Sequence, residues 1–79
     1  IYEFIEKFSV LPNPVSNNLY VKAFDNKIQS IEIFDLTGKT VYSNYFNDSL
    51  IEQIEIEALN SGFYFDNVNA TQIFKIIKK

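Results

Sequence analysis

The sequence contains no histidine and no cysteine, and these two absences narrow its possible chemistry. Histidine and cysteine supply the commonest zinc ligands, and they also supply many general bases and the thiol nucleophiles. The serines have no histidine to activate them, and no disulfide bond can form. We therefore expect neither a cofactor nor enzymatic activity.

Methionine and long apolar runs are also absent. The longest apolar runs, Leu19-Tyr20-Val21 and Phe63-Tyr64-Phe65, contain three residues each, whereas a membrane-spanning helix needs about 20. We therefore predict no transmembrane segment. Because the chain begins at Ile1, we expect it to be a piece of a longer protein whose targeting segment lies elsewhere.

The formal net charge is −3, and the charge is unevenly distributed. Residues 1–70 contain 4 lysines and 10 acidic residues, whereas residues 71–79 contain 3 lysines and no acidic residue. An acidic body lacks the cationic stripe that follows a phosphate backbone. Nucleic acid is therefore not an expected partner.

Glu52, Glu55 and Glu57 are the only carboxylate cluster in the sequence. The last two alternate with Ile54 and Ile56, which indicates one solvated face of a strand. A calcium loop would need closely spaced Asp, Asn and Gly ligands. We therefore predict no metal site.

Alternation of apolar and polar residues recurs along the chain, and no helical spacing lasts for two turns. This period of two predicts β-strands at residues 4–11, 18–24, 28–35, 39–46, 50–57, 62–68 and 71–78. Turn-forming residues separate them at 25–27, 35–38, 47–49 and 59–62. Seven short strands predict one all-β domain, an antiparallel β-sandwich with immunoglobulin-like Greek-key connections.

The parity of the strands predicts which side chains face the core. The expected core consists of Leu19, Val21, Ala23, Ile31, Ile33, Leu50, Ile54, Ile56, Tyr64, Val68, Phe74 and Ile76. The aromatic residues expected near the rims are Tyr42, Tyr45, Phe46 and Phe63. Gly38 and Gly62 each end a turn, where we expect a positive φ that other residues adopt with strain.

Pro12 and Pro14 flank Asn13 between the first two predicted strands. Each proline fixes φ near −65° and lacks an N–H donor, so this segment cannot pair as an interior strand. Asn13 precedes a proline and is therefore expected to be extended. We interpret Leu11-Pro12-Asn13-Pro14 as a rigid corner that turns a strand from one sheet to the other.

Five motifs, taken in order, resemble the C-terminal sorting domain (type A) of cargo proteins of the bacterial type IX secretion system. The resemblance covers residues 8–79, and its motifs are LPNP (11–14), NLYV (18–21), IEIFDLTGKTV (31–41), LNSGFYF (59–65) and FKIIK (74–78). It implies a β-sandwich at the C-terminus of a larger secreted protein. Residues 1–7 would then be a linker or the end of the upstream cargo, and residues 8–79 the sorting domain.

The resemblance also implies the partners and the location. Such a domain directs its cargo from the periplasm of a Gram-negative bacterium through the outer-membrane translocon, to the cell surface or the medium. A cell-surface cysteine peptidase of the system, its sortase, usually removes the domain afterwards. The expected partners are thus the translocon, this peptidase and the cargo domain.

The family's motifs assign recognition to particular residues of this chain. They are Pro12, Asn13, Pro14, Gly38, Lys39, Leu59, Gly62, Tyr64, Lys75, Lys78 and Lys79. Lys78 and Lys79 follow the last predicted core position, so we expect both to be exposed. The chain departs from the family at Asp66, where Val or Leu is usual, and we expect Asp66 at a rim or at a kink.

Two other functions remain open at this point. A non-catalytic immunoglobulin-like module that binds carbohydrate or a cell surface would need a concave aromatic patch. A structural spacer would need a further domain after Lys79. The sequence favours the sorting domain because all five motifs occur in order.

Overall fold

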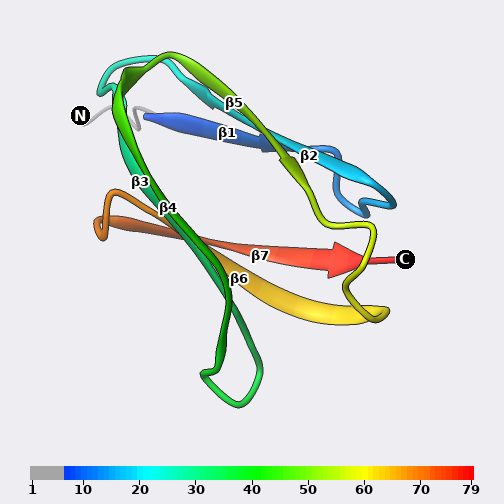
Figure 1. The fold of residues 1–79 in the computed structure, drawn as a ribbon. Helices are drawn as coiled ribbons and strands as arrows, with labels where there is room; N and C mark the ends of the chain where they lie inside the picture. The colour runs from blue at the N-terminus through cyan, green and yellow to red at the C-terminus, as the bar shows by residue number, and fades with distance from the viewer. Residues whose placement is uncertain (1–6) are drawn as a thin grey trace, which may run out of the picture.

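Residues 7–79, which are described by a computed structural model, form seven β-strands and no helix (Figure 1). The strands are β1 (Phe8–Leu11), β2 (Asn18–Ala23), β3 (Ile28–Asp35), β4 (Thr40–Ser49), β5 (Ile51–Glu55), β6 (Gly62–Val68) and β7 (Gln72–Lys78). The predicted all-β class is confirmed. Residues 4–6 of the first predicted strand lie outside the described residues.

The strands form two antiparallel sheets, β1-β2-β5 and β4-β3-β6-β7. The chain passes from one sheet to the other between β2 and β3, between β4 and β5, and between β5 and β6. An immunoglobulin-like sandwich pairs its second strand with its fifth and its third with its sixth. This chain has the same pairing, so the predicted Greek-key sandwich is confirmed.

The core lies between the sheets, because side chains of one parity on each strand point inward. The buried apolar side chains are Phe8, Val15, Leu19, Val21, Ile28, Ile31, Ile33, Ile54, Ile56, Tyr64, Val68 and Ile76. Phe8, Val15 and Ile28 were not expected in the core. Ala23 and Phe74 were expected there, and they pack against it only partly buried.

The prediction for Leu50 is wrong, because its side chain is 61 % exposed. β4 continues to Ser49 and β5 begins at Ile51, so Leu50 lies at the bend where the chain leaves one sheet for the other. The turn expected at residues 47–49 is likewise part of β4. Asp48 has a φ of 56° there, next to an irregularity in the register between β3 and β4.

The prediction for Asp66 is also wrong. β6 is unbroken, and Asp66 lies near its middle, opposite Ile33 of β3 and Phe74 of β7. Its side chain has the inward parity of Tyr64 and Val68, and it is 0 % exposed. The carboxylate therefore occupies a core position without disturbing the strand.

Both glycines have the predicted positive φ, 89° at Gly38 and 149° at Gly62. A Cβ atom at Gly62 would meet no heavy atom within 4 Å. A side chain at this position would have space, so the requirement for glycine comes from the backbone conformation alone.

Replacing Gly62 by alanine is expected to lower the free energy of unfolding by about 1–3 kcal/mol, because alanine is strained at this φ. Chemical denaturation of the purified domain measures the change. Ser61→Ala, at the exposed neighbouring position, is the control and should have little effect. Equal stability of the two variants would contradict the backbone argument.

Candidate functional site

Three segments that carry the expected recognition motifs meet at one end of the sandwich (Figure 1). They are the β1–β2 connection, the β5–β6 connection and the last part of β7, and we call residues 12–17, 57–62 and 75–79 the motif end. Lys78 lies opposite Gly62 in the β6–β7 pair. Motifs that are far apart in the sequence therefore form one region of the surface.

The corner at residues 11–14 takes the chain from the three-stranded sheet to the edge of the four-stranded sheet, but only for an isolated bridge at Val15. The predicted change of sheet is therefore local, because β2 lies in the same sheet as β1. Leu11 still pairs with Tyr20 of β2, in the three-stranded sheet. Val15 already forms a parallel bridge with Lys78 of β7, in the four-stranded sheet. Within this short segment the peptide bonds before both prolines are cis.

Asn13 and Val15 together cover the outer edge of β7, and we call their contacts the edge clamp. The Asn13 side chain accepts a hydrogen bond from the Ile77 amide at 2.9 Å and donates one to the Lys75 carbonyl at 3.0 Å. The Val15 amide donates to the Ile77 carbonyl at 2.8 Å, and the Lys79 amide donates to the Val15 carbonyl at 2.9 Å. Because prolines have no N–H, the Asn13 side chain supplies bonds that a regular strand would make with its backbone.

The lysines of β7 differ in exposure, and the expectation for Lys78 is wrong. Lys78 has the inward parity of Ile76 and is only 7 % exposed. Its ammonium group reaches the Lys79 carbonyl at 3.0 Å, so the apolar stem is buried while the charge lies at the strand end. Lys79 is exposed, as expected, and so is Lys75, whose ammonium group lies 4.6 Å from the ring centre of Phe63.

The Leu59–Tyr64 motif forms the corner before β6. The Leu59 amide donates to the Ile56 carbonyl at 3.0 Å. The Tyr64 hydroxyl donates to the Asn60 carbonyl at 2.7 Å, four residues upstream. Immunoglobulin-like domains have the same tyrosine corner at the start of their sixth strand. This contact gives the Gly-x-Tyr motif a structural role that the sequence analysis did not identify.

Gly38 and Lys39 lie apart from the motif end, in the β3–β4 turn. One carboxylate oxygen of Asp35 accepts hydrogen bonds from the Thr37 hydroxyl at 2.6 Å, the Thr37 amide at 2.9 Å and the Lys39 amide at 3.0 Å. The hydroxyl bond contributes most to holding the pKa of Asp35 below its ordinary value. Gly38 therefore serves a turn that Asp35 organises.

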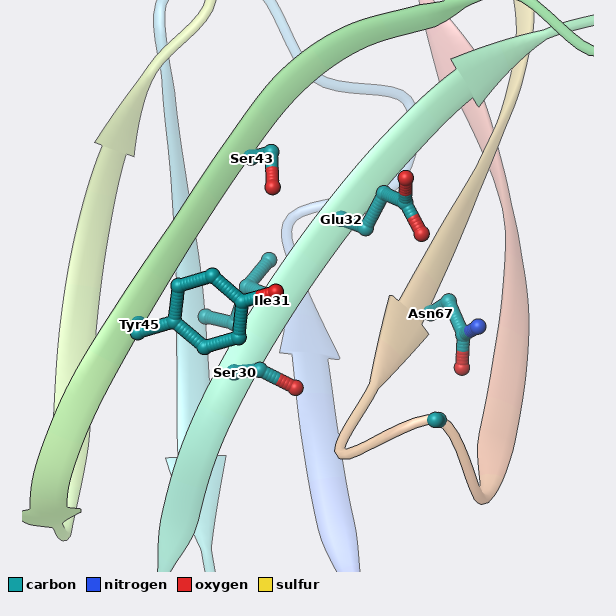
Figure 2. Close-up of a pocket in the computed structure, with 7 residues that line it drawn as sticks. Ser30, Ile31, Glu32, Ser43, Tyr45 and Asn67 are labelled. Atoms are coloured by element: carbon teal, nitrogen blue, oxygen red, sulfur yellow. The ribbon is translucent and has the colours of Figure 1, made fainter.

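A shallow pocket of about 200 Å³ lies on the outer face of the four-stranded sheet. Figure 2 shows side chains from β3, β4 and β6 on this face, with the Tyr45 ring beside Ser30 and with Ile31 behind β3. The lining residues are Ser30, Ile31, Glu32, Ser43, Tyr45, Asn67 and Ala70. None of them belongs to the expected recognition residues.

Residues 7–79 contain no group of three or more acidic side chains arranged to hold a metal ion. The same residues contain no helix long and apolar enough to cross a membrane.

Residues 9–79 match the family model described as the secretion system C-terminal sorting domain. The chain belongs to this family. No curated protein and no solved structure matches it. The sorting domain is a signal for the type IX secretion system, and it directs the protein that carries it across the outer membrane to the cell surface or beyond.

Exchanging Asn13 for alanine in the sorting domain is expected to remove two hydrogen bonds to β7, each of which contributes about 1 kcal/mol. Hydrogen exchange of the Ile77 amide should then accelerate, and the free energy of unfolding should fall. The control is Asn17→Ala, because the Asn17 contact to the Ile56 amide uses the backbone carbonyl. If the two variants exchanged equally at Ile77, the side-chain part of the edge clamp would be refuted.

Proposed function

We propose that the export machinery recognises the sorting domain as a folded surface, and that the motif end is this surface. The proposed partners are the outer-membrane translocon and the cell-surface cysteine peptidase of the system. The supporting observation is the edge clamp, because it joins the motif of the β1–β2 connection to the last residues of β7. Lys78 of β7 in turn lies opposite Gly62 of the third motif segment.

Five of the recognition residues fall into two groups by what they contact. Asn13, Gly62 and Tyr64 shape the motif end through backbone geometry and hydrogen bonds. Lys75 and Lys79 are exposed there and offer positive charge on a chain whose net charge is −3. A translocon surface with complementary negative charge would be drawn to this end by electrostatic attraction.

In this function the domain acts without catalysis and is the substrate of the peptidase. We propose that residues 1–7 form the junction with the cargo, where the peptidase acts, and that residues 8–79 form the sorting domain. This boundary is supported by the family match, which begins at residue 9, and by β1, which begins at Phe8.

The sorting function is tested by fusing a soluble periplasmic reporter to the N-terminus of the complete chain in a bacterium that has the type IX system. The reporter should reach the medium or the cell surface with the chain attached, and it should stay in the periplasm without it. Retention of a folded, stable fusion in the periplasm would refute sorting by this chain.

The role of charge at the motif end is tested by Lys79→Glu in the same fusion. The exposed side chain leaves stability nearly unchanged, so slower export would report on recognition. Lys27→Glu is the matched control, because Lys27 is exposed in the β2–β3 connection, outside the motif end. Equal export rates for both variants would exclude Lys79 from recognition while leaving the sorting function standing.

A further inference from the structure

Asp66 is an acidic side chain in the apolar core of the sandwich. It is 0 % exposed, and neither carboxylate oxygen has a hydrogen-bond partner among residues 7–79. Buried carboxylates in proteins are normally paired or hydrogen-bonded, because an isolated buried charge is strongly destabilising. The stability of the fold therefore depends on whether this unpaired carboxyl group, near the middle of β6, carries a charge.

The neighbours of Asp66 within its own sheet offer no compensating charge. Ile33 of β3 and Phe74 of β7 flank it across the strands, and Tyr64 and Val68 share its face of β6. The hydroxyl of Tyr64 already donates to the Asn60 carbonyl. Tyr42 of β4 lies one strand further away, beyond Ile33.

The remaining groups of inward parity that carry charge are engaged elsewhere. Asp35, at the end of β3, accepts hydrogen bonds within its own turn. Glu52 of β5 accepts a hydrogen bond from the Ser49 hydroxyl, and the Lys78 ammonium group at the end of β7 donates to the Lys79 carbonyl. The inward side chains of β1 and β2 are apolar, as Phe8 and Leu19 illustrate. Nothing facing Asp66 in the described core therefore stabilises its ionised form.

We infer that Asp66 makes the folded domain sensitive to pH, so that the sandwich is most stable in acid and loosens as the pH rises to neutral. The carboxyl group fits the core when it is protonated, and it becomes a buried, unpaired charge when it ionises. The inference concerns the fold alone and does not depend on the proposed recognition surface. In a sorting domain, this pH dependence would change how readily the core unfolds during export or during removal of the domain.

The direction of the effect follows from proton linkage. Burial raises the pKa of Asp66 from 3.8 to about 7 in the folded state. Between these two values the folded state binds more protons than the unfolded state, so stability falls as the pH rises. The contribution of protonated Asp66 to stability is fully present below the unfolded pKa, and it is lost completely above the folded pKa. In this window the folding constant decreases up to tenfold per pH unit.

The test compares denaturant unfolding of the wild-type domain, Asp66→Asn and Asp66→Leu between pH 5 and pH 8. The wild-type folding constant should fall roughly fiftyfold between pH 5 and pH 7 and level off near pH 8. Both variants should lose this dependence. Asp25→Asn, which removes an exposed carboxylate from the β2–β3 connection, is the control and should keep the wild-type dependence.

The readout is the change of the folding constant with pH. A general destabilisation of Asp66→Asn by its buried amide therefore does not alter the conclusion. An NMR titration of the Asp66 carboxyl carbon in the wild-type domain measures the group directly, even if neither variant folds. A folded-state pKa near neutral is the expected result. A value at or below the ordinary range for aspartate, or equal pH dependence in wild type and variants, would overturn the inference.

Discussion

The edge clamp is the contact on which the rest of the sorting domain depends. Asn13 and Val15 follow a strand of one sheet and bind the outer edge of β7, the last strand of the other sheet. The clamp thus joins the two sheets, and it closes a backbone edge that could otherwise pair with another chain. It also fixes the positions of Lys78 and Lys79, the last two residues of the motif end.

The motif of the β5–β6 connection acts on the same end of the sandwich through different contacts, whereas Gly38 and Lys39 lie apart from it. The tyrosine corner at Tyr64 holds the β5–β6 connection, and the φ of Gly62 sets the direction in which β6 begins. Neither residue is a reactive group. Motifs of this kind preserve the shape of a surface, which is what the proposed recognition of a folded domain requires.

The sequence predicted the strands and the sandwich well, because alternation and turn chemistry are local properties. It was less informative where distant contacts decide the outcome. Asn13 binds Lys75 and Ile77 across 62 and 64 positions of sequence, and only its place between two prolines hinted at a special role. Parity correctly implies that Asp66 and Lys78 point inward. The prediction instead ended the core before Lys78 and placed Asp66 at a rim or at a kink, in line with the usual position of charged residues at the surface. Leu50 was misplaced because the bend between β4 and β5 interrupts the alternation.

Hydrogen exchange along β7 of the unmodified domain tests the edge clamp most directly. By the two-residue period, the amides of Ile73, Lys75, Ile77 and Lys79 all face the outer edge of β7. Of these four amides, the clamp engages only those of Ile77 and Lys79, so these two should exchange slowly, whereas the amides of Ile73 and Lys75 should exchange rapidly. Uniformly rapid exchange at all four amides would contradict the account, because β7 would then have an open edge and a free end.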